Sequence, residues 1–257
     1  MFKIKRLFYV SILFSLLFGC VKIEKDRDVL FQISTINALL EGIYDGEITF
    51  EELKQHGDLG LGTFNALDGE MLMLDGYIYQ VKADGKVYPA EDSMKTPFSA
   101  VTFYEEDKTL VLDSTLDYKS LEEFLDKILP TENIIYAIKI EGLFKYVRTR
   151  SVPAQEKPYP TLAEVVKTQP EFEFHNINGK LVGFRLPDYL NGINVPKYHL
   201  HFITEDKIGG GHLLECETDR IKIGIDFTDK IFISLPETKE FYDADLEKGR
   251  DLEKVER

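Results

Sequence analysis

Apolar residues alternate with polar ones, or form short runs, through most of the chain after residue 60, as expected for β-strands. Residues 71–74 and 77–81 flank Asp75-Gly76, a pair typical of a two-residue hairpin turn. Residues 134–140 are apolar except for Lys139, as expected of a buried strand. A further hairpin is predicted within residues 172–186, turning at Asn178-Gly179. Strands are then expected to continue to residue 235.

A few short helices are predicted between these strands. Residues 36–40 follow Ser34-Thr35 and precede Gly42, and residues 49–52 read Thr-Phe-Glu-Glu, a capping box. Residues 120–128 form an amphipathic helix that ends before Pro130, and residues 161–167 form another short helix. The fold class is therefore α+β, with two β-rich halves built from mixed or antiparallel sheets. We place the halves at residues 29–150 and 151–257, on either side of a proline-rich segment.

The first twenty residues have the features of an export signal. Lys3, Lys5 and Arg6 precede an apolar run at residues 7–18, which is too short to span a membrane. Residues 17–20 read Leu-Phe-Gly-Cys and resemble a bacterial lipobox, so we expect Cys20 to be lipidated, with residues 21–28 as a charged tether. The alternative is a secretory signal with an incidental cysteine. Either interpretation predicts export, and the first places the protein in the bacterial cell envelope as a membrane-anchored lipoprotein.

Composition limits the partners of the domain. A net charge of -14 disfavours binding to nucleic acid or to an anionic membrane surface, so membrane contact is expected only through the lipid anchor. If Cys20 carries lipid, Cys216 is the single remaining cysteine, and the domain must fold without an internal disulfide. The 44% hydrophobic content, with 18 Phe and 13 Tyr, is sufficient for a large core.

Three of the five histidines lie within fourteen residues. His199 and His201 alternate with Leu200 and Phe202, so on a strand the two imidazoles point to the same face. The turn-forming residues 204–211 let the chain double back and bring His212 onto a neighbouring strand. Three imidazoles suit zinc, nickel, copper or iron and leave a coordination position open, as in catalytic metal sites. The simpler alternative is a histidine-rich strand that packs against aromatic residues.

Two other segments have a composition suited to substrate binding. Residues 60–70 surround Thr63 and the carboxylate of Glu70 with small residues, which let the backbone approach a ligand closely. Arg148 and Arg150 precede a proline-rich loop, and an arginine fork suits a carboxylate substrate. Ordinary turns and solvated surface charge are the structural alternatives for these two segments.

Several blocks of this sequence together resemble the α-acetolactate decarboxylase family over about residues 29 to 257. They are Gly-Asp-Leu-Gly-Leu-Gly-Thr-Phe at residues 57–64, Leu-Asp-Gly-Glu at 67–70, Arg-Ser-Val-Pro-Ala-Gln at 150–155, Pro-Tyr at 158–159, and the segment from 192 through the histidines to 212. The resemblance implies a homodimer that binds Zn²⁺ and converts a small 2-hydroxy-3-keto acid, 2-acetolactate, into acetoin and carbon dioxide.

The resemblance also implies roles for individual residues. His199, His201 and His212 would ligate the zinc, and Thr63, Glu70 and Arg150 would line the substrate site. The family has an active-site glutamate in the C-terminal tail, matched best by Glu256, with Glu253 as the alternative. The reaction suits such a site, because loss of carbon dioxide leaves negative charge that a metal stabilises and a carbon that needs a proton. Glu70 and Arg150 together are the expected proton-delivery groups.

Two other functions remain open on the sequence alone. A cupin-type metal oxygenase would use His199, His201 and Glu205, although its third histidine belongs on a much later strand. A noncatalytic lipoprotein that binds a ligand on a β scaffold would need neither metal nor turnover.

Overall fold

The computed structural model describes residues 27–247, 252 and 255. The expected signal peptide, Cys20 and most of the tether therefore lie outside the described residues, as do Glu253 and Glu256. In the described part, no helix has the length and apolar character that a membrane crossing requires.

The elements follow one another along the chain with short connections. The strands are β1 (Val29–Ile33), β2 (Ile48–Thr49), β3 (Leu59–Thr63), β4 (Glu70–Leu74), β5 (Tyr77–Val81), β6 (Val87–Pro89), β7 (Lys95–Thr96), β8 (Ser99–Thr102), β9 (Lys108–Asp113), β10 (Ile135–Arg150), β11 (Glu171–Leu186), β12 (Lys197–Thr204), β13 (Gly210–Thr228) and β14 (Lys230–Ser234). The α-helices are α1 (Ile36–Leu40), α2 (Phe50–Leu53), α3 (Tyr118–Ile128), α4 (Leu162–Val165) and α5 (Lys239–Asp243), and the short 3₁₀ turns are η1 (Asn65–Leu67), η2 (Val166–Thr168) and η3 (Asp188–Leu190).

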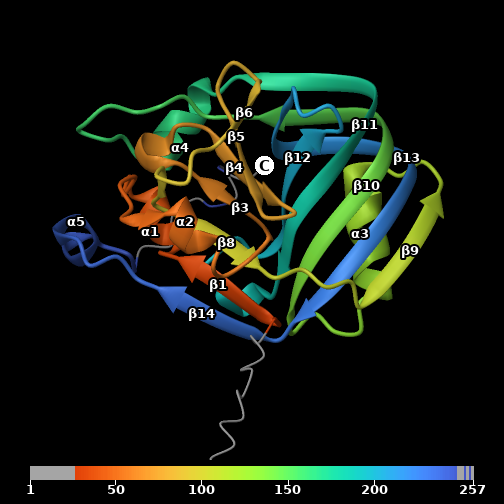
Figure 1. Cartoon of the computed structure of the whole chain (residues 1–257), viewed down its shortest axis with the longest axis horizontal. Helices are drawn as coiled ribbons and strands as arrows, with labels where there is room; N and C mark the ends of the chain where they lie inside the picture. Colours follow the sequence, from red (N-terminus) through yellow and green to blue (C-terminus); the bar gives the residue numbers. More distant parts are fainter. Residues whose placement is uncertain (1–26, 248–251, 253–254, 256–257) are drawn as a thin grey trace, which may run out of the picture.

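Two sheets contain most of these strands, as Figure 1 shows. The first has the strand order β14-β1-β8-β3-β4-β5-β6, and the second has the order β10-β11-β12-β13-β9, with β10 also pairing with β13. Apart from the parallel pair β1 and β14, the strand pairs in both sheets are antiparallel. The α+β fold class, with mixed and antiparallel sheets and short helices, is confirmed.

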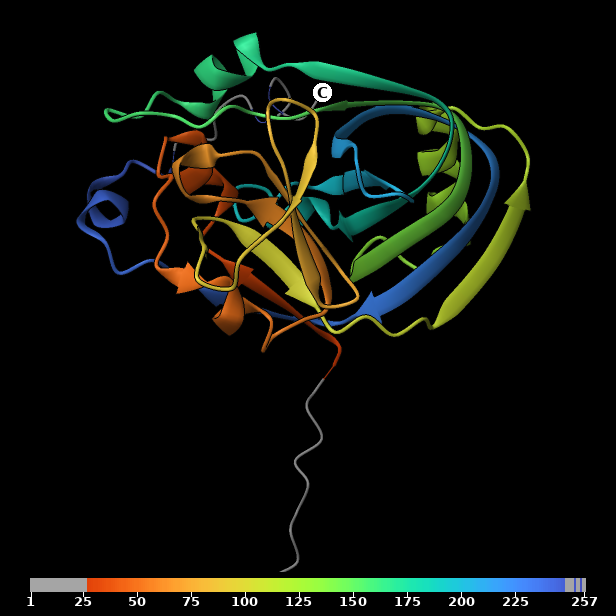
Figure 2. The ribbon, with the colours of Figure 1, turned by 45° about the horizontal axis from the view of Figure 1, so that its top comes forward.

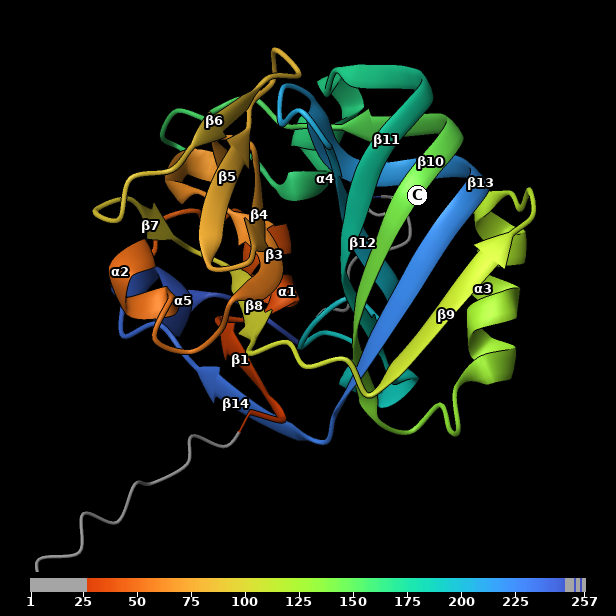
Figure 3. The same ribbon diagram turned by 45° about the vertical axis from the view of Figure 1, so that its right-hand side comes forward.

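Apolar side chains fill the space between the sheets and cover their outer faces. One cluster joins Leu61 and Leu72 of the first sheet to Val182 and Phe184 of the second. Figure 3 shows the two sheets facing each other, with α3 beyond the second one. Helix α3 packs Leu121 and Leu125 against the core of that sheet, because its apolar residues recur at helical spacing on one face. The two sheets therefore form one continuous packed body.

The local signals in the sequence explain several of these elements. Thr35 caps α1, and Thr49 with Glu52 forms the predicted capping box of α2. Asp75 and Gly76 join β4 to β5 with positive φ angles of 52° and 77°, as the hairpin turn requires. These predictions are confirmed, although α3 begins at Tyr118, two residues before the predicted start, because Asp117 supplies the N-cap.

The predicted hairpin at Asn178-Gly179 is wrong. β11 runs without a turn from Glu171 to Leu186, and it pairs with β10 along this length. Gly179 serves close packing here, because a Cβ at this position would lie 2.4 Å from the ring of Phe202. Tertiary packing thus explains why Asn178 and Gly179 lie within a strand, although local turn statistics assign this pair to a turn.

The sheets also do not divide at the expected boundary after Arg150. β10 ends at Arg150 yet lies in the second sheet with β11 and β13, while β14 returns from the second sheet to pair with β1. Figure 1 shows β1 and β14 side by side at the lower edge of the body, and Figure 2 shows the same body with its top turned forward. The C-terminal part of the chain therefore contributes to both sheets.

A buried carboxyl group joins β13 to the segment before β9. Asp226 is only 1% exposed, and its Oδ2 accepts a hydrogen bond from the backbone N–H of Glu105 at 3.2 Å. Burial, together with the nearby charge of Asp107, raises the pKa of Asp226 to about 7. Because the folded protein holds this proton more tightly than the unfolded chain, with its pKa of about 3.9, the free energy of unfolding decreases as pH rises from about 4 through 7.

Replacing this carboxyl group should remove that pH dependence. Asp226→Asn keeps an oxygen that can accept the Glu105 hydrogen bond but carries no charge, so we expect its melting temperature to exceed that of the wild type by about 2–5 °C at pH 8. The difference should disappear near pH 4, where Asp226 is protonated in the folded wild type. Thermal denaturation at both values checks this, with the exposed Asp229→Asn variant as control. An equal difference at both values would contradict the assignment.

Candidate metal and active site

Three imidazoles meet where β12 and β13 pair. His201 lies directly opposite His212 in this antiparallel pair, and His199 lies two residues before His201 on the same face. One ring nitrogen of each histidine lies within 4.8 Å of the others, and all three residues are buried. Leu200 and Phe202 point to the opposite face and join the core that α3 covers. The predicted clustering of His199, His201 and His212 is confirmed.

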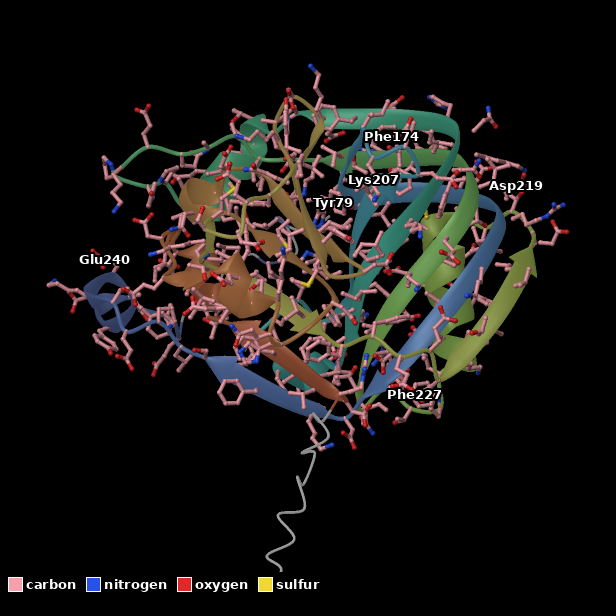
Figure 4. The ribbon with its side chains drawn as sticks, viewed as in Figure 1. Tyr79, Phe174, Lys207, Asp219, Phe227 and Glu240 are labelled. Atoms are coloured by element: carbon pink, nitrogen blue, oxygen red, sulfur yellow. The ribbon has the colours of Figure 1, made fainter. Side chains whose placement is uncertain are left out.

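The turn between β12 and β13 fixes the pairing that aligns these histidines. A Cβ at Gly210 would lie 2.4 Å from the carbonyl oxygen of Phe202, and Gly211 adopts a φ angle of 136° beside the carbonyl oxygen of Arg150. Lys207 in the turn donates a hydrogen bond from Nζ to the hydroxyl of Tyr79 on β5 at 2.6 Å, and the two side chains meet in Figure 4. The histidine hairpin is therefore anchored to the first sheet.

The environment of His199 and His201 favours the neutral form of their imidazoles, which is the form that binds metals. Burial, and then the charge of Arg150, lower the pKa of His199 to about 3. Burial also places the pKa of His201 well below its usual value. The Nδ1 atom of His201 lies 2.8 Å from the backbone carbonyl oxygen of Met71, so Nδ1 carries the proton and Nε2 presents a lone pair.

The donor set fits a metal ion. The Nε2 atom of His201 is buried and makes no hydrogen bond, so a cation there would satisfy an atom that otherwise loses its solvation without compensation. Three imidazole nitrogens in close array, one oriented by a backbone carbonyl, match the ligands of transition-metal sites. A metal site at His199, His201 and His212 is the reading that the geometry supports.

The predicted substrate residues surround the histidines. The Oε2 atom of Glu70 lies 3.5 Å from Nε2 of His201, and its Oε1 lies 3.7 Å from Nη1 of Arg150. β4 positions Glu70, and the end of β10, where Arg150 pairs with His212, positions the arginine. Thr63 pairs with Glu70, and its hydroxyl donates a hydrogen bond to the carbonyl oxygen of Gly69 at 2.7 Å. The structure thus brings Thr63, Glu70 and Arg150 together beside the histidines.

These groups share one pocket. Its polar wall consists of the three histidines with Thr63, Glu70 and Arg150, and its other wall is apolar. The remaining lining residues are Ile36, Leu39, Gly62, Leu67, Phe98, Val152 and Leu162. Such a pocket suits a small molecule with short alkyl groups at one end and charged or chelating oxygens at the other.

Two residues that sequence reasoning missed contact Arg150. Its Nη1 donates to Oε1 of Gln169 at 3.1 Å, and its Nη2 donates to the carbonyl oxygen of Val255 at 2.9 Å. Val255 is 2% exposed and packs in the same apolar cluster as several lining residues, with Leu252 beside it. No sequence motif marked either residue, although the apolar Val255 within a charged tail is a signal that the tail packs against the body.

Comparison with known proteins identifies the family of this chain. The model of the family described as "Alpha-acetolactate decarboxylase" matches residues 30–248. An alpha-acetolactate decarboxylase of Methanosarcina mazei is 51% identical, over 90% of this chain and 81% of that protein. The chain belongs to the alpha-acetolactate decarboxylase family.

Solved structures of the alpha-acetolactate decarboxylase family also share the fold. The crystal structure of the enzyme from Bacillus subtilis strain 168 superposes with a TM-score of 0.87 at 41% identity, covering 89% of this chain and 99% of that one. A Staphylococcus aureus protein described as similar to the decarboxylase superposes with a TM-score of 0.81 at 31% identity, covering 84% of this chain and 94% of that one. These likenesses extend over both sheets.

The family assignment and the geometry together argue against the cupin-type oxygenase. Glu205 is exposed in the turn between β12 and β13, and the buried group of possible ligands in the described residues consists of the three histidines without it. The chain is a carboxy-lyase of this family, so the hypothesis of a noncatalytic binding protein is rejected as well.

Removing one imidazole should abolish the metal site. We expect His201→Ala to lose most of its bound metal on dialysis, because two histidines hold a divalent ion far more weakly than three. Elemental analysis of the dialysed protein measures this. His175→Ala, which removes an exposed histidine from β11, is the control and should keep the metal content of the wild type. Full occupancy in His201→Ala would show that the site is elsewhere.

Proposed function

We propose that the three histidines hold a zinc ion and that Glu70 and Arg150 act beside it in the decarboxylation of 2-acetolactate. The conversion of acetolactate to acetoin and carbon dioxide is the activity that family membership gives to this chain. The observation that carries the proposal is the buried group of three imidazoles adjoining the side chains of Glu70 and Arg150.

Zinc is the proposed metal because three neutral imidazoles with an open position are its usual catalytic ligand set. When bound, the ion would supply a Lewis acid that stabilises negative charge developing on the substrate oxygens. The protein contributes a site that excludes most water, since each of the three histidines is at most 6% exposed. Low exposure strengthens every electrostatic interaction with the substrate.

Arg150 is proposed to bind and orient the substrate carboxylate. It is a buried cation in the described residues of the pocket, and its planar guanidinium can form paired hydrogen bonds with a carboxylate. A very tight ion pair would stabilise the substrate as much as the transition state and oppose the loss of carbon dioxide. The bonds that Arg150 already makes to Gln169 and Val255 limit how closely it can approach the carboxylate.

Glu70 is proposed to hold the proton that completes the reaction. The carbon that loses carbon dioxide must receive a proton on one face to give acetoin of a single hand. Glu70 lies between His201 and Arg150, and it is 7% exposed, so a proton on its carboxyl group is kept from bulk water. The hydroxyl of Thr63 holds the turn before Glu70 through the Gly69 carbonyl, which keeps the carboxyl group at this position.

Acetoin formation from racemic acetolactate by the purified mature domain, with and without a chelator, tests the proposal. We expect Glu70→Gln and Arg150→Lys each to reduce kcat/KM by about 10²-fold or more. Gln keeps the shape of Glu70 but removes its acidic proton, and Lys keeps the charge of Arg150 but removes its fork of donors. The melting temperature should change little. Near-normal rates in both variants would remove these residues from the chemistry, and activity that survives complete metal removal would exclude a required metal ion.

A carboxylate from the C-terminal tail is also proposed to reach the site, with Glu256 favoured over Glu253. Both residues lie outside the described part of the chain. The support is Val255, which precedes Glu256 in the sequence: its carbonyl oxygen is bound by Arg150, and its side chain is buried with residues that line the pocket. Earlier in the tail, Nδ2 of Asn37 donates a hydrogen bond to the carbonyl oxygen of Leu246 at 2.9 Å.

Deletion of residues 254–257 tests the tail. We expect this truncation to reduce turnover by about 10²-fold, because it removes both the proposed carboxylate and the Val255 contact to Arg150. Zinc content should remain at the level of the full chain, since three histidines already bind the metal. The replacement Glu256→Gln removes only the carboxylate and keeps the Val255 backbone contact, so it separates the effects of the two losses. Full activity in the truncated protein would show that the tail has no part in catalysis.

Location and assembly are proposed from the sequence. The lipobox at residues 17–20 supports a lipoprotein anchored through Cys20 to a membrane of the cell envelope, and the acidic body would make no other membrane contact. The family resemblance supports a homodimer. Mass analysis of the N-terminal peptide and sedimentation of the mature domain measure these two properties.

A further inference from the structure

Gln169 supplies Arg150 with a neutral side-chain acceptor. The Oε1 atom of Gln169 accepts a hydrogen bond from Nη1 of Arg150 at 3.1 Å. The same Nη1 lies 3.7 Å from Oε1 of Glu70. One nitrogen of the guanidinium is therefore placed between a neutral acceptor and a carboxylate, and the neutral acceptor is the closer of the two.

The chain fixes the position of Gln169 through its backbone. The 3₁₀ turn η2 ends at this residue, and Pro170 after it favours the extended conformation that Gln169 adopts, with a ψ angle of 138°. The backbone N–H of Ser151 donates to the carbonyl oxygen of Pro170 at 3.3 Å, so the segment lies directly beside the end of β10. Gln169 thus faces Arg150 because β10 and β11 begin to pair at this point.

Two neighbouring groups make contacts of their own. Glu171, two residues further along, pairs instead with Arg148, whose Nη1 lies 2.6 Å from Oε2 of Glu171. On the other side of the guanidinium, Nη2 of Arg150 donates to the Val255 carbonyl oxygen. Each terminal nitrogen of Arg150 therefore donates a hydrogen bond to a neutral oxygen, one from Gln169 and one from Val255.

We propose that Gln169 is a positioning residue, a neutral anchor that keeps the Arg150 guanidinium turned toward the substrate and prevents it from closing onto Glu70. This proposal rests on the role of Arg150 in the proposed function. An unrestrained pair of arginine and carboxylate contacts at about 2.7–2.9 Å, whereas Arg150 and Glu70 are 3.7 Å apart. A closed pair would direct the arginine charge to Glu70, and the substrate carboxylate would lose its partner.

Two replacements separate the neutral acceptor from the shape of the side chain. Gln169→Met keeps the length but has no good acceptor, so Arg150 should loosen, and we expect kcat/KM to decrease by about 10-fold through both a lower kcat and a higher KM. Gln169→Glu keeps the acceptor but adds a charge that pairs with Arg150, so we expect a larger decrease, of about 10²-fold.

Gln155→Met is the matched control. Gln155 lies in the same connection between β10 and β11, and its Nε2 donates to the carbonyl oxygen of Pro153 at 2.7 Å rather than to a charged group. Melting temperature and zinc content should match the wild type in all three variants. A second measurement uses calorimetric binding of 2-hydroxy-2-methylpropanoate, an unreactive 2-hydroxy carboxylate, whose Kd should increase about 5-fold in Gln169→Met and remain unchanged in the control.

The outcomes distinguish this proposal from the one on which it rests. If Gln169→Met matches Gln155→Met in kinetics and in Kd, Gln169 does not position Arg150. A loss of activity that comes with lost zinc or a lower melting temperature would show a structural role instead. Wild-type rates in Gln169→Glu would show that a neutral acceptor is not required. Failure of the wild type itself to form acetoin would overturn the proposed function, and the Kd comparison would still report on Gln169.

Discussion

The pairing of β12 with β13 is the constraint on which the site depends. His201 and His212 belong to different strands, and their imidazoles meet only because the two residues are direct partners in the antiparallel ladder. A shift of one residue in this register would turn His212 to the opposite face. The glycines at the start of β13 and the bond from Lys207 to Tyr79 hold the register, so packing between the two sheets determines the geometry of the histidines.

Arg150 connects the parts of the site that lie far apart in the sequence. Its backbone pairs with His212, and its side chain contacts Glu70 on β4, Gln169 before β11 and Val255 in the tail. Burying an arginine is unfavourable unless its donors are satisfied, so these contacts are a requirement of the fold as well as of the proposed chemistry. A change at any one of them is expected to move the charge that faces the substrate.

The sequence predicted the parts of this site that depend on short-range pattern. Alternation along residues 198–202 placed His199 and His201 on one face, and the turn residues after them placed His212 on the next strand. The family resemblance contributed Thr63, Glu70 and Arg150, which turn chemistry alone left open. Contacts between distant segments could not be predicted, since nothing local to Gln169 or Val255 indicates that Arg150 lies beside them.

The wrong hairpin prediction has the same origin. Asn178-Gly179 has the composition of a turn, but the long pairing of β11 with β10 and the ring of Phe202 keep it extended. The domain boundary after Arg150 stays a prediction from composition, and the pairing of β14 with β1 joins the two ends of the described chain. Strand order is set by which apolar faces can be buried together, and a single sequence does not specify that choice.

X-ray absorption at the zinc edge of the purified, fully loaded protein tests the central claim most directly, because it reports the atoms bound to the metal. Three histidines and an open position predict imidazole nitrogens at about 2.0–2.1 Å from zinc, with the remaining coordination supplied by oxygen. The scattering pattern of the imidazole rings should fit three rings. A sulfur neighbour at about 2.3 Å, or a fit with fewer than three rings, would contradict the site formed by His199, His201 and His212.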